Sequence, residues 1–438
     1  MTAKSPARGY WLAIPESIQA LIADSFRKTN FAATLSQSTN RKIIPSTRWV
    51  PAPHAPTQKG FAEGSEGLVN LWCLLDGDDN ILDRIIVKQV HPGATRYDDP
   101  SNWKDGVVGG EPRECAMANA VWAALSDAHK KHVLECLGWG DCKREPRWRY
   151  RLYFEYSAHG DLSTIIRGQK GELVRTGQKR KADDDEVLLP EPFIWYLFKS
   201  LAEVICAMNV AGDGQGMIHG DMQVSNVFFS HPDGEMFALY PTPKLADFGS
   251  SRSLADPGVK NRGDVVRRDA CCMLFAPPEL VKINDGVVWE VRDGPNTSLS
   301  NKTNIWQVGM LIACCMRLNT YLPETNWRGI ASSHWEAPEA EQLRFRGTKG
   351  RRQLRRRHLV HENSRYSNPL INTVERCLRF DPNERPTPET LLKAVKKYMQ
   401  EPVADISDYQ PIGSVAEDMH RHKLRVNLDD KYGISKKF

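Results

Sequence analysis

Apolar residues follow two patterns along the chain, with short runs in its first part and helical periodicity in its second part. Gly67–Leu75 and 85–90 are apolar runs on either side of the polar turn 76–80, an arrangement that predicts a β-hairpin. Further strands are predicted at 152–156, 218–229 and 239–248. Apolar residues at helical spacing predict helices at 116–125, 193–210, 305–318, 370–380 and 388–399. The sequence therefore predicts an α+β fold of two lobes, a small β-rich lobe with one helix and a larger helical lobe, with a ligand in the cleft between them.

The globular part of the chain is flanked by segments of different composition. Residues 1–58 contain many Ser, Thr and Pro residues and form an extension, in which the amphipathic segment 14–22 is a candidate docking helix. The globular part is expected at 59–400. Residues 401–438 are polar and are expected to be a loose tail.

Two lobes and two inserts are expected within the globular part. The first lobe is expected at about 59–156 and the second at about 157–400. The charged stretches 167–190 and 344–358 are expected to be solvated inserts in the second lobe. A basic cluster in the first insert, 178–181, also fits a nuclear-localisation signal. The arginine-rich second insert also fits a surface for acidic protein, nucleic acid or phosphoinositide.

Composition excludes several classes of protein. With 41% hydrophobic and 26% charged residues among 438, the chain is neither collagen-like nor wholly disordered. Its net charge of +5 is too small for its length to indicate a nucleic-acid-binding protein. Charges interrupt every apolar stretch before the roughly 18 residues that a membrane span needs. The first twenty residues lack the apolar core of a signal peptide, so we expect an intracellular protein, cytoplasmic, nuclear or both.

Two polar segments carry the strongest candidate chemistry. In Ile218-His-Gly-Asp-Met-Gln-Val-Ser-Asn226, Asp221 and Asn226 stand five apart in a polar loop between apolar strands. Asp247 follows in Lys244-Leu-Ala-Asp-Phe-Gly, at the end of a short strand. Phosphoryl transfer needs such groups, because Mg²⁺ prefers oxygen ligands and an attacking hydroxyl needs a nearby carboxylate.

These segments match the H-x-D-x-x-x-x-N and D-F-G motifs of protein kinases. From about 59 to 400 the chain resembles a eukaryotic-type protein kinase domain. The resemblance implies that Asp221 orients and deprotonates the acceptor hydroxyl, and that Asn226 and Asp247 hold Mg²⁺. It also implies ATP and Mg²⁺ as cofactors and a protein substrate, with serine or threonine favoured as the acceptor.

Upstream segments fit the nucleotide site of the same family. Ala62, Gly64, Gly67 and Val69 fit the Gly-rich phosphate loop, with Ala62 where the first Gly is usual, although an ordinary hairpin turn is the alternative. Lys88, at the end of a β-branched run, fits the strand lysine that reaches the α- and β-phosphates.

The resemblance also implies a carboxylate partner for that lysine and a hinge beside the adenine. Glu114 fits the carboxylate best, and Glu111 is the alternative because the preceding linker is long. Glu155 and Ser157 fit the hinge, after Phe154 at the back of the adenine pocket.

Downstream segments extend the resemblance through the second lobe. Residues 275–279 match A-P-E with one change, and Arg385 fits the arginine that the family pairs with Glu279. Trp306 and Gly309 fit the helix motif D-x-W-x-x-G, in which Asn304 replaces the Asp.

Departures from the family pattern concern catalysis and its regulation. Gly220 replaces the arginine that normally binds a phosphate on the activation loop, and 254–279 contains no Ser, Thr or Tyr. We therefore expect no switch by activation-loop phosphorylation. Gln223 replaces a lysine that stabilises the transferring phosphate, and Cys272 replaces the threonine that this lysine contacts. Loss of one such group typically costs about two to three orders of magnitude in rate, unless an arginine of the loop substitutes.

Three functions are compatible with the motifs. The first is an active, divergent protein kinase, which is favoured because Lys88, Glu114, Asp221, Asn226 and Asp247 are all present. The second is a nucleotide-binding pseudokinase that serves as a scaffold. The third is small-molecule phosphotransfer, because H-G-D also occurs in aminoglycoside kinases, although those lack the A-P-E block.

Overall fold

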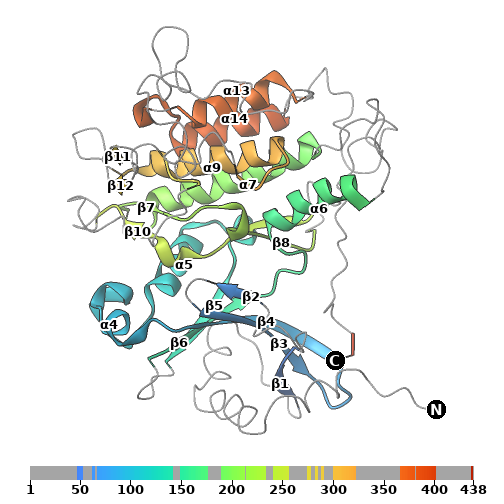
Figure 1. Ribbon diagram of the computed structural model, residues 1–438, viewed down its shortest axis with the longest axis vertical. Helices are drawn as coiled ribbons and strands as arrows, with labels where there is room; N and C mark the ends of the chain where they lie inside the picture. Colours follow the sequence, from blue (N-terminus) through green and yellow to red (C-terminus); the bar gives the residue numbers. More distant parts are fainter. Residues whose placement is uncertain are drawn as a thin grey trace. The chain divides into compact units, whose positions relative to one another are not determined.

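A computed structural model of the chain describes most of both expected lobes. The described residues are 47–52, 62–64, 67–141, 148–175, 189–212, 214–232, 240–255, 274–277, 282–284, 288–290, 299–321, 366–379, 381–400 and 436–437. They form two compact units. The described residues up to Asn119 belong to the first unit, together with Leu134–Ala158 and the last two residues, and the others belong to the second unit (Figure 1).

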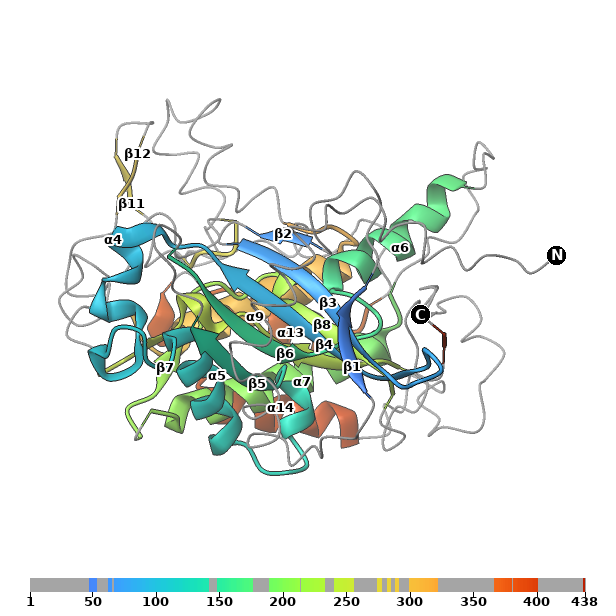
Figure 2. The same cartoon turned by 90° about the horizontal axis from the view of Figure 1, so that it is seen from below.

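The first unit is built on an antiparallel sheet of six strands (Figure 2). The strands run in the order β1-β3-β4-β6-β5, and β2 also pairs with β3. Their bounds are Arg48–Pro51 for β1, Ala62–Gly64 for β2, Gly67–Leu75 for β3, Ile81–Val90 for β4, Cys136–Asp141 for β5 and Tyr150–Glu155 for β6. The β3–β4 hairpin and the strand at 152–156 were predicted correctly.

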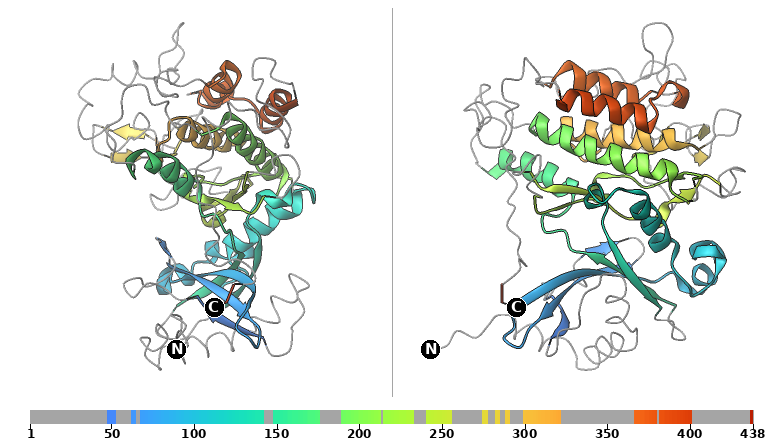
Figure 3. Two further views of the ribbon diagram at one scale, coloured as in Figure 1. Left: turned by 90° about the vertical axis from the view of Figure 1, so that its right-hand side faces the viewer. Right: turned by 180° about the vertical axis from the view of Figure 1, so that it is seen from behind.

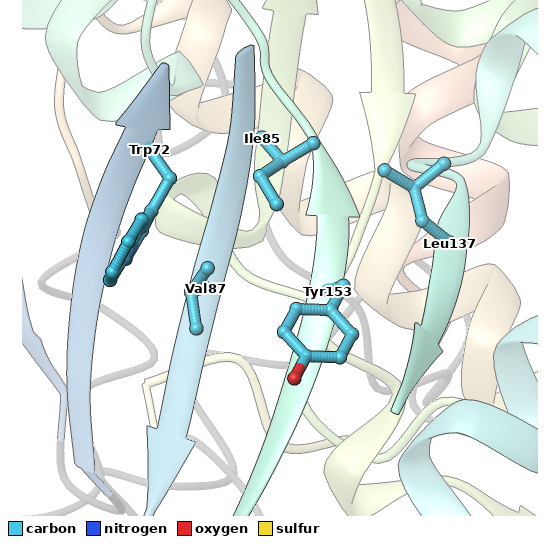
Figure 4. Close-up of a cluster of buried hydrophobic side chains, with 5 residues drawn as sticks. All are labelled: Trp72, Ile85, Val87, Leu137 and Tyr153. Atoms are coloured by element: carbon cyan, nitrogen blue, oxygen red, sulfur yellow. The ribbon is translucent and has the colours of Figure 1, made fainter. Parts of the chain in front are cut away.

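Buried apolar side chains lie on both faces of this sheet. On one face Trp72, Ile85, Val87, Leu137 and Tyr153 form a cluster drawn from four neighbouring strands (Figure 4). A second cluster of buried residues lies in the same sheet and contains Ala52, Leu71, Cys73, Leu75 and Ile81. The two clusters alternate along β3, because successive strand residues point to opposite faces.

Short helices and one longer helix follow β4. Gly93–Tyr97 forms α4, Pro100–Asn102 and Lys104–Gly106 form the 3₁₀ turns η1 and η2, and Arg113–Ala124 forms α5. The buried indole of Trp103 donates to the Tyr97 carbonyl at 2.6 Å, and this hydrogen bond links the end of α4 to the residue between η1 and η2. The part that contains α4, η1 and η2 was predicted only as a linker, whereas α5 agrees with the helix predicted at 116–125.

The second unit is mainly helical. Its longer helices are α6 (Leu162–Arg175), α7 (Glu191–Val210), α9 (Asn301–Met316), α13 (Asn368–Cys377) and α14 (Pro388–Gln400). Helix α7 packs against α9 and α14, and α13 packs against α9, so α13 and α14 form an outer layer (Figure 3). Four of these helices agree with the predicted ones.

Helix α7 forms much of the core of this unit. Among the described helices it alone has the length and apolar composition to cross a membrane, in spite of Lys199 and Glu203. However, 78% of its most apolar window is buried inside the protein. Burial against α9 and α14 accounts for its composition.

Helices α9 and α13 approach each other closely at Gly309. A Cβ atom on Gly309 would lie 2.7 Å from the Cβ of Cys377, so only glycine fits there. Helix α9 begins with a capping box between Ser300 and Thr303. These two features determine where α9 begins and how closely it packs.

Three sequence predictions were wrong. Residues 1–58 were expected to be an extension outside the globular part, but Arg48–Pro51 forms β1, which pairs with β3 in the sheet. The stretch 167–190 was expected to be a solvated loop, but α6 continues to Arg175, and Gln169 within it is fully buried. The C-terminal tail was expected to be loose, but its two described residues pair with the β3–β4 turn: the Ile81 amide donates to the Lys436 carbonyl at 3.1 Å. Tertiary contacts, which leave no local pattern in a polar segment, account for the buried Gln169 and for the pairing of residues 436–437. The predictions at 14–22 and 344–358 lie outside the described residues.

Candidate active site

The polar loop at 219–226, here called the catalytic loop, follows the two-residue strand β7 (Met217–Ile218) and ends in the 3₁₀ turn η4 (Val224–Asn226). The Asn304 amide of α9 accepts from the His219 backbone N–H at 3.0 Å and donates to the Met217 carbonyl at 2.9 Å. Asn304 is fully buried. An amide both donates and accepts, so Asn304 satisfies two backbone groups of opposite polarity.

Backbone geometry explains why glycine precedes Asp221. Gly220 has a φ of 81°, and a Cβ atom there would lie 2.8 Å from the Ser250 carbonyl oxygen. An arginine would therefore be strained and would require the chain around Ser250 to move. The carbonyl of Gly220 accepts from the Gln307 side-chain amide at 3.0 Å.

The Asp221 carboxylate accepts hydrogen bonds from two amides of the same loop. Gln223 Nε2 lies 3.0 Å and Asn226 Nδ2 lies 3.1 Å from Asp221 Oδ2. Asn226 also donates to the Asp221 carbonyl at 2.8 Å. Because Asn226 is buried, these bonds hold Asp221 in one orientation within the loop.

A two-stranded ribbon places Asn226 and Asp247 at the same end. Strand β8 (Val227–Ser230) pairs with β9 (Thr242–Leu245), with Val227 opposite Leu245. Just beyond this pair, the Ala246 N–H donates to the Asn226 carbonyl at 2.9 Å. The expected strands at 218–229 and 239–248 are therefore shorter than predicted, and their ends form the site.

The oxygen atoms at this end of the ribbon suit Mg²⁺. Asn226 and Asp247 supply an amide oxygen and a carboxylate, which are hard ligands. Among the described residues, no three His, Cys, Asp or Glu side chains gather into a metal site. One carboxylate and one amide oxygen are the donor set expected of a site that holds Mg²⁺ together with substrate phosphates, because Mg²⁺ is rarely enclosed by protein ligands alone.

Asp247 has a left-handed backbone, with φ 62° and ψ 70°, at the start of the 3₁₀ turn η5 (Phe248–Ser250). His219 Nε2 lies 3.0 Å from the carbonyl oxygen of Ala246, and the His219 ring contacts the Phe248 ring at 4.9 Å between centroids. His219 thereby connects the catalytic loop to the residues on both sides of Asp247, through the Ala246 carbonyl and the Phe248 ring.

Burial keeps His219 neutral. Desolvation lowers the pKa of this completely buried imidazole to about 4, although the nearby Asp247 carboxylate acts in the opposite direction. Its neutral ring donates from Nε2, because its partner is a carbonyl oxygen. His132 is similar: burial lowers its pKa to about 4, while a contact of Nδ1 with the Pro243 carbonyl at 3.1 Å raises it.

These two histidines predict a loss of stability in mild acid. The pKa of each is lower in the folded state than in the unfolded state, so the unfolded chain takes up protons first as the pH falls below about 6.5. Between about pH 6.5 and pH 4 each histidine should remove up to about 3 kcal/mol from the free energy of unfolding. Urea unfolding at pH 7 and pH 5 measures this effect, and His132→Gln should make the difference smaller. Equal free energies of unfolding at the two pH values would contradict the prediction.

In the first unit, Lys88 pairs with Glu114. The Lys88 ammonium lies 2.9 Å from both carboxylate oxygens of Glu114, and the two side chains are 14% and 5% exposed. The alternative partner, Glu111, pairs instead with Lys104 at 3.1 Å. Val69 stands directly opposite Lys88 in the β3–β4 register, so both lie on the same face of the sheet.

The segment expected to be a Gly-rich loop is a tight hairpin. Strands β2 and β3 pair with Gly64 opposite Gly67 and Ala62 opposite Val69. A Cβ on Gly67 would lie 1.9 Å from the Gln89 carbonyl oxygen, so glycine is required for close approach to β4. The geometry therefore agrees with both interpretations of the segment, a phosphate loop and a hairpin turn.

The two residues expected at the hinge lie at the end of β6. Glu155 closes the strand, and its carboxylate accepts from the Glu135 backbone N–H at 2.8 Å. Ser157 follows two residues later, outside regular secondary structure. The Glu155 carboxylate thus holds the chain that leads into β5.

Arg385 is buried, at 2% exposure, and its guanidinium stacks over the Trp306 ring at 5.0 Å. It donates to the carbonyls of Arg379 at 2.8 Å and Lys302 at 3.0 Å. Its expected partner, Glu279, lies outside the described residues, as does Cys272.

Comparison with known proteins agrees with this geometry. The family described as the protein kinase domain matches residues 124–398, which is more than half of the chain. The chain belongs to the protein kinase domain family. The match includes Asp221, Asn226 and Asp247 of this kinase domain and begins after Lys88 and Glu114.

Curated relatives are kinases of low identity. The serine/threonine-protein kinase ENV7 of Saccharomyces cerevisiae is 27% identical over 184 residues, which are 41% of each chain. The serine/threonine-protein kinase Nek9 of Xenopus laevis is 22% identical over 55% of this chain and 19% of its own length. The G2-specific protein kinase nim-1 of Neurospora crassa is 20% identical over 64% of this chain and 28% of its own length. The chain thus spans less than half the length of each relative.

Sequence reasoning missed two buried residues of the kinase domain that contact the catalytic loop, Ser251 and Gln307. Gln307 is the side chain that contacts the Gly220 carbonyl, and it was read only as part of an apolar helix. The available signal was an amide in the otherwise apolar run after Asn304. Asn304 was noted as a departure from the family, but its two backbone contacts were not foreseen.

Proposed function

We propose that the chain is a Mg·ATP-dependent protein kinase that transfers the γ-phosphate to a serine or threonine hydroxyl. The observation that carries this proposal is the arrangement of Asp221, Asn226 and Asp247. Two amides of the loop orient the Asp221 carboxylate, and the β8–β9 ribbon brings Asn226 and Asp247 to the same end. The names of two relatives, which call them serine/threonine-protein kinases, support the choice of acceptor.

Each polar group has a role in this proposal. Asp221 accepts the proton of the acceptor hydroxyl as the hydroxyl oxygen attacks the γ-phosphorus; the bond from that phosphorus to the β–γ bridging oxygen breaks, and ADP leaves. Asn226 and Asp247 hold Mg²⁺, which when bound neutralises charge on the phosphates. Lys88 contacts the α- and β-phosphates, and Glu114 holds the lysine in position. Hinge residues Glu155 and Ser157 and the β2–β3 hairpin complete the nucleotide site.

The proposed kinase acts without phosphorylation of its activation loop. Segment 254–279 contains no hydroxyl residue, and Gly220 supplies no guanidinium to bind a phosphate. The left-handed backbone of Gly220 further opposes any arginine there. Treatment with a phosphatase should therefore leave the rate of transfer unchanged.

Incubation of the full chain with Mg²⁺, γ-labelled ATP and a basic protein as acceptor tests the proposal. Label on serine or threonine of the acceptor supports it. Binding of ATP, measured by a shift in melting temperature, without any transfer would overturn it in favour of a scaffold. Label transferred to an aminoglycoside and not to protein would overturn it in favour of small-molecule phosphotransfer.

Glu114 in the first turn of α5 and Glu111 just before the helix can be compared as a matched pair of substitutions that test the nucleotide site. Glu114→Gln should lower kcat/KM for ATP by about tenfold, because it removes the charge that holds Lys88 and weakens positioning of the phosphates. Glu111→Gln makes the same chemical change beside Lys104 and should leave kcat/KM unchanged. Equal effects of the two substitutions in the labelled-ATP assay would contradict the role given to Glu114.

A further inference from the structure

Gln307 is a polar side chain in the core of the second unit. It lies on α9 between Trp306 and Val308, and all three side chains are fully buried. Its Nε2 donates to the Gly220 carbonyl at 3.0 Å. Gly220 directly precedes Asp221, so this hydrogen bond links a core helix to the residue next to the proposed catalytic carboxylate.

This amide is costly to bury. Gln307 Oε1 has no hydrogen-bond partner among the described residues, and an unpaired buried polar atom typically costs about 1–3 kcal/mol. An apolar side chain of the same size would remove that cost. Packing alone therefore does not explain a glutamine at this position. We attribute it to the hydrogen bond that its side chain donates to the Gly220 carbonyl.

Other parts of the catalytic loop already have restraints of their own. Asn304 holds the backbone at Met217 and His219, and the Ser251 hydroxyl donates to the His219 carbonyl at 3.2 Å. Asn226 holds the Asp221 carbonyl. The carbonyl between these groups belongs to Gly220, and glycine is the residue with the greatest backbone freedom. Gln307 restrains the loop at this point.

The same point is where the family normally uses an arginine. Gly220 cannot contact a phosphate through a side chain, and 254–279 provides no residue to phosphorylate. A restraint from the core, independent of the activation loop, can replace such a contact. The buried amide of Gln307 supplies it in every folded molecule.

We propose that Gln307 is a positioning residue, which fixes the Gly220 carbonyl and thereby the orientation of Asp221 without a phosphorylated activation loop. This inference rests on the proposed kinase function for its effect on rate, whereas its effect on the loop is independent of catalysis. Loss of the hydrogen bond should lower kcat by about 10- to 100-fold, because displacements of about 1 Å at a reacting group have effects of that size.

The test compares two substitutions in the full chain. Gln307→Met removes the donor and keeps the length of the side chain. Thr373→Val is the matched control, because the buried Thr373 of α13 donates to the Pro369 carbonyl of its own helix, away from the catalytic loop. The measurements are kcat and KM for ATP, the melting temperature, and hydrogen–deuterium exchange of a peptide covering 217–226.

We expect Gln307→Met to lower kcat with little change in KM and to accelerate hydrogen–deuterium exchange in 217–226. Thr373→Val, with a melting temperature similar to that of Gln307→Met, should change neither kcat nor exchange. Equal kcat values for the two variants, or a lower kcat that follows the melting temperature alone, would overturn the proposal. If the wild-type chain binds ATP but transfers no phosphate, the proposed function fails. Hydrogen–deuterium exchange of 217–226 then tests the positioning role by itself. Unchanged exchange in Gln307→Met overturns that role, and faster exchange supports it.

Discussion

Asp221→Asn is expected to lower the rate of phosphate transfer by about three orders of magnitude, because removal of a general base costs about 10²- to 10⁴-fold. The substitution preserves shape. An asparagine oxygen at this position can still accept from Gln223 and Asn226, which now lie 3.0 and 3.1 Å from Asp221 Oδ2. Basicity and charge are lost, while the loop geometry is retained. The initial rate with γ-labelled ATP measures the effect.

The control for this change is Asp105→Asn. Asp105 is exposed in the first unit and has a left-handed φ of 54°, which asparagine also adopts readily. It undergoes the same change of charge, and transfer should remain at the wild-type rate. Transfer by Asp221→Asn at more than a tenth of the wild-type rate would show that Asp221 is not the proton acceptor.

Gln223→Lys is expected to raise the rate of transfer by about tenfold to a hundredfold. A side chain at this position reaches the Asp221 carboxylate, since Gln223 Nε2 lies 3.0 Å from Oδ2. An ammonium group would supply positive charge where the transferring phosphate becomes more negative, and one such group is worth about 10²- to 10³-fold when optimally placed. The gain should be smaller than that limit because Cys272 replaces the threonine that normally contacts the lysine.

A second lysine substitution distinguishes the effect of a positive charge beside Asp221 on kcat from the effect of a higher net charge. Gln215 is exposed in the turn before β7, so Gln215→Lys adds the same charge outside the catalytic loop. It should leave kcat unchanged. An unchanged or lower kcat in Gln223→Lys, with the melting temperature retained, would show that the missing lysine does not limit catalysis in this chain.

The local pattern of the sequence was sufficient to predict most helices and strands and to identify the catalytic motifs. Helix α7 was predicted from the helical spacing of its apolar residues, and strand β3 from a short apolar run beside a polar turn. Both signals depend only on neighbours in the chain. Asp221, Asn226 and Asp247 were identified because motif spacing is also local. Helix α6 was not predicted, since its residues from 167 onward are largely polar and charged and its buried Gln169 gives no apolar signal.

Only the tertiary structure showed which of the polar side chains contact one another. Both Glu111 and Glu114 can be placed beside a lysine from sequence, and only the packing of α5 on the sheet assigns Glu114 to Lys88. The contact of Gln307 with Gly220 joins residues 87 positions apart. Such pairs have no periodic signature, because they depend on how helices and loops pack rather than on the preference of any segment. The sequence by itself therefore determined the family and its polar residues, whereas tertiary packing determined which of these residues contact one another, such as Gln307 of α9 and Gly220.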